Sequence, residues 1–226
     1  MKKQWVSWLV FCGLLPMAVV LGTALFSEKR YAVLSLVTAA GACVPFFLRF
    51  ERRRPSTREL LVLAVMVAMT VLGRVLFAPL PGFKPVTALV IITALSFGGE
   101  MGFLTGAMGA LISNFYFGQG PWTPFQMLVW GLLGFFAGVL APLLKRSRGA
   151  LLVYGAISGA VYSLLMDLWT VLWWDGGFNV PRYLAALATA LPYTVLYMVS
   201  NVVFLLVLAK PIGKKLERIR RKYMED

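Results

Sequence analysis

The sequence predicts an all-α protein that is embedded in a membrane. Hydrophobic residues make up 60% of the 226 residues, and the mean hydropathy is +0.80. One water-soluble core of this chain length cannot enclose so much apolar surface, so most of it must face lipid. The apolar residues also fall in eight runs separated by short polar segments. These runs lie at residues 4–26, 31–49, 59–79, 86–97, 101–117, 125–144, 150–174 and 183–209.

The first two runs predict a two-helix membrane unit at residues 1–50. The first run follows Lys2 and Lys3, as the apolar core of a signal peptide would. We interpret it as a retained helix, because it is longer than most signal cores and no small-x-small cleavage site follows it. Cys12 and Cys43 fall inside these helices, where cysteine behaves as a small hydrophobic residue. The two cysteines therefore indicate neither a disulfide framework nor a metal site.

A basic linker at residues 51–58 separates this unit from six further helices at residues 59–209. Its arginines are typical of a cytoplasmic anchor under the positive-inside rule, and recognition of anionic lipid is the alternative. Ser56 or Thr57 is expected to cap the third helix, with Glu59 in its first turn complementing the helix dipole.

The fourth run is unusually short, with 12 residues at 86–97, whereas a membrane-spanning helix needs roughly 17 to 25. A glycine break at 98–102 follows it, and a polar and aromatic loop at 118–124 follows the fifth run. The fourth and fifth runs form either two crossings or a re-entrant hairpin. Small residues then recur at the spacing that allows close helix packing in lipid: Gly102, Gly106, Ala110, Gly131, Gly134, Gly138, Gly155 and Gly159.

The positive charges predict the orientation of the chain in a cell membrane. With both termini in the cytoplasm, most of the 22 lysines and arginines lie inside, many of them in a basic tail at residues 210–226 that extends the last helix. Only Lys29, Arg30, Lys84 and Arg182 fall outside. This asymmetry favours a multi-pass protein with both termini cytoplasmic. Because the cations lie in short loops beside membrane helices, no nucleic-acid partner is expected.

Two charged residues fall within apolar helices, and charge in a membrane is costly enough to indicate function. Arg74 and Asp167 are both expected in the outer half of their helices. They could form an ion pair with each other, or one or both could contact a polar substrate. For Arg74, snorkelling to the membrane surface is the alternative.

The outer loops and the helix ends beside them gather aromatic and polar side chains, which suit a pocket for an amphipathic ring system. The predicted substrate-binding residues are Arg74, Phe83, Lys84, Asn114, Gln119, Trp122, Thr123, Gln126, Trp130, Asp167, Trp173, Trp174 and Tyr193. For Trp122, Trp173 and Trp174, an interfacial aromatic belt is the alternative. Pro192 is expected to bend the last helix and present Tyr193 to the cavity.

Four short elements follow one another after residue 59: AVMVA at 64–68, LPGFKP at 80–85, FGGEMG at 97–102 and GAMGA at 106–110. In this order they make residues 59–209 similar to the substrate-binding S component of an energy-coupling factor (ECF) vitamin transporter. The resemblance implies a six-helix, S-component-like bundle, here preceded by two extra N-terminal transmembrane helices that depart from the family pattern.

The resemblance also implies partners. These are a transmembrane coupling subunit and two cytoplasmic ATPases. The ATPases use ATP, and this chain is expected to bind no cofactor. Ala64 and Ala68 match the family's small-residue strip that docks on the coupling subunit, and ordinary packing within the chain is the alternative. The loops at 83–85 and 118–124 are most similar to members that take cobalamin-type substrates.

The predicted function is therefore vitamin binding for uptake, of cobalamin or a related corrinoid, with another small vitamin or precursor as the alternative. A cell-envelope membrane scaffold is the alternative from a different class. No enzyme activity and no metal site are expected. The sequence shows no nucleophile–base pair, paired carboxylates or metal-ligand cluster, and it contains no histidine.

Overall fold

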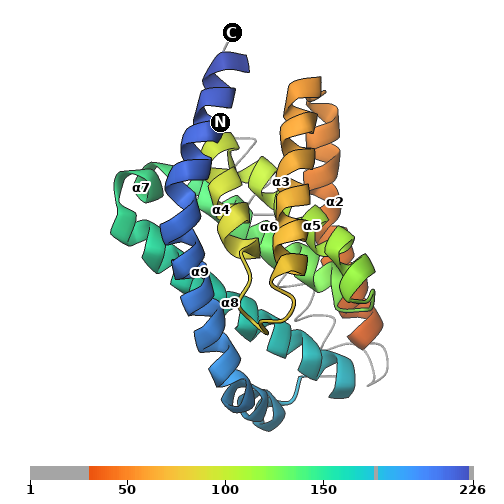
Figure 1. Cartoon of the computed structure of the whole chain (residues 1–226). Helices are drawn as coiled ribbons and strands as arrows, with labels where there is room; N and C mark the ends of the chain where they lie inside the picture. Colours follow the sequence, from red (N-terminus) through yellow and green to blue (C-terminus); the bar gives the residue numbers. More distant parts are fainter. Residues whose placement is uncertain (1–30, 176–177, 224–226) are drawn as a thin grey trace.

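The computed structural model describes residues 31–175 and 178–223, and Figure 1 shows how the helices of this part of the chain are arranged. The described residues form eight α-helices and no strand. The helices are α2 (Tyr31–Arg52), α3 (Thr57–Leu76), α4 (Val86–Phe97), α5 (Gly99–Phe117), α6 (Thr123–Val139), α7 (Ala141–Arg146), α8 (Arg148–Asp175) and α9 (Val180–Tyr223). The helix expected at 4–26 lies outside the described residues.

Helix α3 begins where the sequence predicts, because a capping box fixes its first turn. The Ser56 hydroxyl accepts a hydrogen bond from the Glu59 N–H at 3.2 Å, and the Glu59 carboxylate accepts one from the Ser56 N–H at 3.0 Å. Arg53 of the linker pairs with Glu59 at 3.0 Å and reaches Glu100 of α5 at 3.9 Å. The linker is thereby tied to both α3 and α5.

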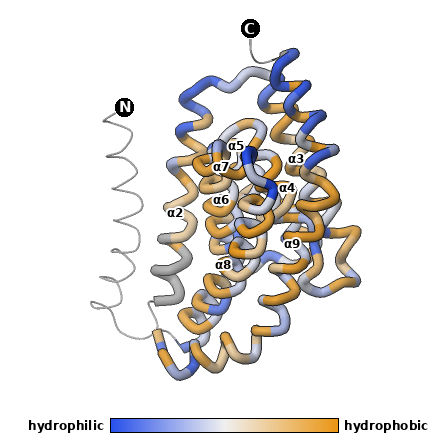
Figure 2. Tube along the Cα trace, turned by 90° about the vertical axis from the view of Figure 1, so that its left-hand side faces the viewer, coloured by the Kyte–Doolittle hydropathy of each residue, from blue (hydrophilic) through white to orange (hydrophobic). Residues whose placement is uncertain are grey.

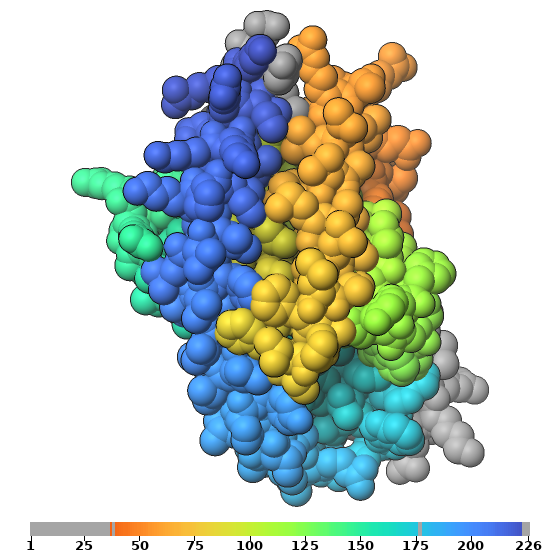
Figure 3. Space-filling view, in the orientation of Figure 1, coloured from red at the N-terminus to blue at the C-terminus, as the bar shows by residue number. Residues whose placement is uncertain are grey.

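Helix α4 is short because protein encloses it. Its 12 residues, ten of them buried, extend about 18 Å. Helices α3, α5, α6 and α9 all pack against it, and Figure 3 shows it only as a narrow strip between α3 and α9. A helix covered in this way need not match the thickness of the hydrocarbon layer, since lipid does not reach its backbone. Gly98, with φ of +92°, then turns the chain back into α5.

The single helix expected at 125–144 is two helices, so that prediction was wrong. Helix α6 ends at Val139, and α7 begins at Ala141. Pro142 has no N–H to donate, and its ring would clash with a carbonyl of the preceding turn, so the helical hydrogen bonds cannot continue across it. The Leu140 carbonyl instead accepts from the N–H groups of the next turn. Figure 1 shows α7 at the edge of the bundle.

Glycines let two pairs of helices approach closely, as their spacing predicts. A Cβ added at Gly134 of α6 would lie 2.4 Å from the Gly102 carbonyl oxygen of α5. A Cβ added at Gly159 of α8 would lie 2.6 Å from the Met198 amide nitrogen of α9. Both separations are shorter than van der Waals contact, so only glycine allows these backbones to meet.

Three helices of the described residues are long and apolar enough to cross a membrane: Thr57–Leu76, Arg148–Asp175 and Val180–Lys222. Helix α9, with 44 residues, is about 66 Å long, roughly twice the thickness of a bilayer's hydrocarbon layer. Figure 2 shows hydrophilic residues gathered at the end of the molecule that holds the α2–α3 linker and the end of α9. The long helix therefore continues past the apolar body into this polar end.

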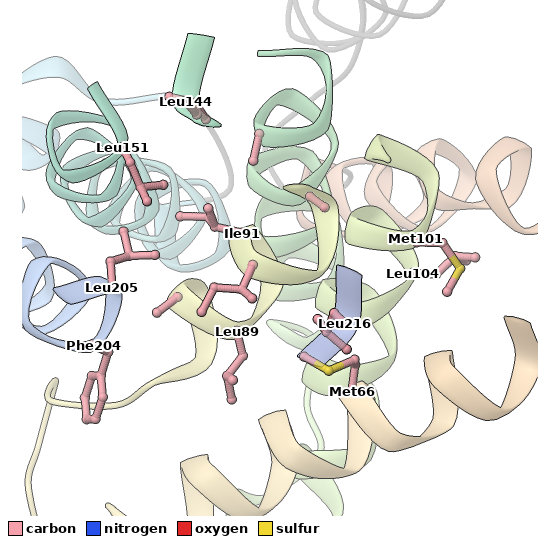
Figure 4. Packing of buried hydrophobic residues seen from close by; sticks show 14 of the residues in the cluster. Met66, Leu89, Ile91, Met101, Leu104, Leu144, Leu151, Phe204, Leu205 and Leu216 are labelled. Carbon is pink, nitrogen blue, oxygen red and sulfur yellow. The ribbon is translucent and has the colours of Figure 1, made fainter. Parts of the chain in front are cut away.

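The basic tail continues α9, as predicted, and it packs on the bundle. Leu216 is 6% exposed and belongs to the same buried cluster as Met66 and Met101; Figure 4 shows it close to Met66. The Arg220 guanidinium donates a hydrogen bond to the Ser96 carbonyl oxygen, at the end of α4, at 3.2 Å. The tail thus covers the polar end of the core.

Helix α2 packs against α5, α6 and α8. The Phe46 ring stacks on the Phe103 ring with their centroids 3.6 Å apart, and it meets the Phe135 ring edge-on at 5.5 Å. This helix is therefore an integral part of the described bundle.

Candidate functional site

A buried cation stands at the end of α3 that lies far from the polar end. Arg74 is in the last turn of α3, where a positive charge complements the helix dipole. Arg74 is only 9% exposed. One terminal nitrogen, Nη1, donates hydrogen bonds to the Ser113 hydroxyl and to the Asn114 side-chain oxygen, the latter at 2.8 Å. The guanidinium carbon also lies 4.6 Å from the Phe117 ring centroid and 5.1 Å from that of Trp130. The cation is therefore held by protein and does not snorkel.

A chain of side-chain hydrogen bonds continues from Arg74 across α5, α6 and α8. The Asn114 amide donates to the Thr123 hydroxyl at 2.9 Å and to the Gln126 side-chain oxygen at 2.8 Å. The Gln126 amide in turn donates to the Tyr162 hydroxyl at 3.2 Å. Because Asn114 is fully buried, each of these bonds satisfies a group that would otherwise be costly to bury. The network fixes the positions of Arg74 and Gln126.

The α3–α4 loop brings a second cation to the same place. Lys84 is anchored through its backbone, because its N–H donates to the Ser200 hydroxyl at 2.9 Å and its carbonyl accepts from that hydroxyl at 3.1 Å. Its ammonium nitrogen lies 4.7 Å from the Phe117 ring centroid. Burial lowers the pKa of Lys84, and the nearby Arg74 charge lowers it further. The two cations thus create a positive potential on one side of the site.

Two adjoining cavities open beside these residues. The first has a volume of about 160 Å³ and is lined by Arg74, Gly82, Lys84, Val86, Thr87, Gln126, Trp130, Gly159, Tyr162, Tyr197 and Asn201. The second has a volume of about 390 Å³ and is lined by Gln126, Tyr162, Ser163, Met166, Asp167, Ala190, Tyr193 and Tyr197. Gln126, Tyr162 and Tyr197 line both, so the cavities form one polar and aromatic site.

The sequence left two alternatives open for Arg74 and Asp167, and the structure does not form the first of them, a direct ion pair. No ion pair of the described residues joins the two. Helix α3 ends at Leu76, earlier than the predicted 79, and Ser113 and Asn114 occupy the guanidinium instead. Arg74 lines the first cavity and Asp167 the second. The Asp167 oxygen Oδ2 is buried and has no hydrogen-bond partner in the described part of the chain. The opposite charges therefore flank a shared space.

The structure gathers about half of the predicted substrate-binding residues around this space. Arg74, Lys84, Gln126 and Trp130 line the first cavity, and Asp167 and Tyr193 line the second, with Gln126 shared. Asn114 and Thr123 support them from behind through the network described above. Gln119 closes the α5–α6 loop, since its amide donates to the Leu111 carbonyl at 2.9 Å and its oxygen accepts from Thr123 at 2.9 Å.

The remaining predicted residues, all aromatic, do not line either cavity. The Phe83 ring packs against Phe204 with centroids 5.0 Å apart, as part of the core. Trp122 meets the Trp169 ring edge-on, with the ring centroids 6.2 Å apart. Trp173 stacks on the same Trp169 ring, with the centroids 6.0 Å apart. Trp174 is 74% exposed. This arrangement agrees with the aromatic-belt alternative for the tryptophans.

The predicted set lacks several polar lining residues, Thr87, Tyr162, Ser163, Tyr197 and Asn201. The Tyr162 ring stacks on Trp130, with centroids 4.9 Å apart and an interplanar angle of 11°. It lies five residues before Asp167 on α8, which places the two about 140° apart around the helix axis, so Asp167 gave no signal for it. Thr87 lies in the first turn of α4, within a buried apolar run that gives no signal either.

The small-residue strip on α3 faces outward. Ala64 and Ala68 are both exposed, whereas Met66 and Val67 of the same turns are buried. The strip is therefore not used for packing within the described chain. Among the described residues there is also no group of three or more His, Cys, Asp or Glu side chains that could hold a metal ion.

These features define a multi-pass helical membrane protein with a polar, aromatic cavity at one end of its bundle. The chain belongs to the family of ECF-type riboflavin transporter S components, whose family model matches residues 54–218. The match begins in the linker before α3 and ends within α9, so α2 lies outside it. No curated protein and no solved structure matches the chain. The protein is thus an S component of an ECF-type vitamin transporter, a family of transport proteins rather than enzymes.

Proposed function

We propose that this chain binds riboflavin, or a closely related flavin, at the outer face of the membrane and delivers it for uptake. The observation that carries the proposal is the joined cavity between Arg74 and Asp167, in a chain of this family. Its stacked Trp130 and Tyr162 rings offer a flat wall for a planar ring system. The other polar lining groups can meet ring carbonyls and nitrogens.

The dimensions of the cavity favour a flavin over a corrinoid. The two parts measure about 160 and 390 Å³, which together fall within the roughly 300–1,000 Å³ of small-molecule sites. A three-ring flavin with its ribityl chain is a molecule of this class. Cobalamin carries a macrocycle, amide arms and a nucleotide loop, and it is several times larger. The family match points the same way, so riboflavin replaces the corrinoid of the sequence prediction as the first candidate.

The polar groups suggest how the ligand is oriented. Arg74 uses Nη1 for Ser113 and Asn114, which leaves three of the five guanidinium N–H donors for a ligand in the first cavity. Carbonyl oxygens of the flavin ring suit these donors. Asp167 lines the second cavity, and its buried Oδ2 atom has no hydrogen-bond partner in the described chain. Ribityl hydroxyls suit this acceptor, because they donate.

The test is direct binding to the purified full chain in detergent. We expect riboflavin to co-purify, identified by mass spectrometry, and to rebind the stripped protein with quenching of flavin fluorescence. Cobalamin and a panel of other vitamins serve as competitors. Failure of every flavin to bind would reject this substrate, and tight binding of cobalamin would restore the corrinoid.

Transport is proposed to need a transmembrane coupling subunit and two ATPases. The exposed Ala64 and Ala68 support this part of the proposal, because a strip of small side chains lets another helix approach closely. The distribution of cations supports cytoplasmic termini, and with this orientation we expect the cavity at the outer face. A membrane scaffold is less well supported, since a scaffold has no need of a polar cavity. Co-expression of the full transporter and measurement of ATP-dependent flavin uptake test this.

A further inference from the structure

A second, larger cavity lies toward the polar end of the bundle, beginning one turn beyond the vitamin site along α9, at Leu205 after Asn201. Its volume is about 590 Å³, and it is bounded by the ends of α4, α7, α8 and α9. The vitamin site shares no lining residue with it. Its walls divide into an apolar floor and a charged rim, which a ligand for this cavity has to match.

The floor is aliphatic. It is formed by Ile92 and Leu95 of α4, Leu151 and Leu152 of α8, and Leu205 and Ala209 of α9. None of its described lining side chains is aromatic, in contrast to the vitamin site. A surface of this kind suits hydrocarbon chains, which need no directional contacts.

The rim carries four cations that face the cavity from two sides. Lys145 and Arg148 flank the α7–α8 junction, and Lys210 and Lys214 lie one turn apart on α9. All four are exposed, and none forms an ion pair with a described residue. Four like charges around one cavity repel one another unless an anion lies between them.

The one carboxylate on the rim does not supply that anion. Glu217 lies 3.6 Å from Arg221, one turn further along α9, so a cation outside the cavity already pairs with it. The rim therefore keeps an excess of positive charge above an apolar floor. Inorganic phosphate would pair with the cations of the rim but leave the apolar floor exposed. A fatty acyl chain alone would cover the floor but leave the cations unpaired.

We infer that this cavity is a binding site for an anionic phospholipid of the cytoplasmic leaflet. The headgroup phosphate lies among Lys145, Arg148, Lys210 and Lys214, and an acyl chain lies on the aliphatic floor. Basic pockets between transmembrane helices at the cytoplasmic side recognise such headgroups by the same combination of charge and depth. The orientation with cytoplasmic termini, proposed above, places the site in the leaflet where basic residues meet anionic lipid. Vitamin binding plays no part in the inference.

The test counts lipids on the full chain by native mass spectrometry, after exchange into neutral detergent. Phosphatidylglycerol and phosphatidylcholine with identical acyl chains are compared. We expect one phosphatidylglycerol to be retained per chain, and a Lys145→Gln/Lys210→Gln variant to bind it about tenfold or more weakly, since each cation near a lipid headgroup contributes roughly 1 kcal/mol. Arg146→Gln/Lys215→Gln removes the same charge from exposed positions that do not line the cavity, and we expect it to bind nearly as wild type.

A third variant tests the floor separately from the charge. Ala209→Trp fills the apolar floor without changing the rim, and we expect it to reduce lipid retention while the elution profile and melting temperature stay near those of wild type. Equal retention of phosphatidylcholine and phosphatidylglycerol would overturn the inference, as would an equal loss in the two charge variants. Complete displacement of the lipid by millimolar inorganic phosphate would also overturn it, because the site would then bind phosphate alone.

Discussion

The carboxylate of Asp167 gives the sharpest test of the vitamin site, because it separates binding from stability. Its Oδ2 atom is buried without a hydrogen-bond partner in the described chain, and the carboxylate lines the second cavity. If the group is kept for the ligand, its replacement by asparagine removes little from the empty protein. The ligand complex, in contrast, loses a hydrogen bond to a charged acceptor.

The expected size of the effect follows from these contacts. A hydrogen bond to a charged group contributes about 1.5–3 kcal/mol, so Asp167→Asn should weaken riboflavin binding about ten- to hundredfold. The free energy of unfolding of the empty protein should stay the same or rise slightly, because the charge of a half-buried carboxylate, one of whose oxygens is buried without a hydrogen-bond partner, is removed. No other described site residue should behave in this way.

The assay is a titration of stripped protein with riboflavin, followed by flavin fluorescence, next to a thermal unfolding curve without ligand. Asp175→Asn is the matched control, because Asp175 pairs with Arg182 at the surface and does not line the cavity. It should leave the dissociation constant unchanged. Wild-type affinity in Asp167→Asn would refute the assignment, and a large loss of stability would show that the carboxylate is structural.

Three further outcomes are expected. Arg74→Met should lower both the melting temperature and riboflavin affinity, because it removes hydrogen bonds within the protein and donors for the ligand, each worth about 1–3 kcal/mol. Gly134→Ala should destabilise the protein by about 1–3 kcal/mol in thermal unfolding, since its Cβ would meet a backbone oxygen of α5 at 2.4 Å, whereas Gly41→Ala, with open space around it, should not. Ala68→Trp should leave riboflavin binding intact but abolish uptake in cells that express the whole transporter, and Val153→Trp, on the exposed face of α8, should spare both.

Several elements could be predicted from the sequence because local signals bound them. Helix α4 runs from Val86 to Phe97 as predicted, since Pro85 precedes it and Gly98 ends it with a positive φ that other residues rarely adopt. The capping box at Ser56 fixed the start of α3 in the same way. Helices bounded by such residues need no tertiary information to be located.

The arrangement of the site depended on information that the sequence does not hold locally. An ion pair between Arg74 and Asp167 was one of the two alternatives that their similar depth left open, but Ser113 and Asn114 of α5 bind the guanidinium instead. The wall formed by Trp130 and Tyr162 joins α6 to α8, and no periodicity predicts which faces of two helices will meet. Long-range packing decides both features.

The enclosed position of α4 has a structural consequence. Its first turn contributes Val86 and Thr87 to the vitamin cavity, and its last turn contributes Ser96, which binds Arg220 of the tail. The 12 residues of α4 therefore join a wall of the proposed vitamin cavity directly to a contact of the basic tail, with no loop between the two.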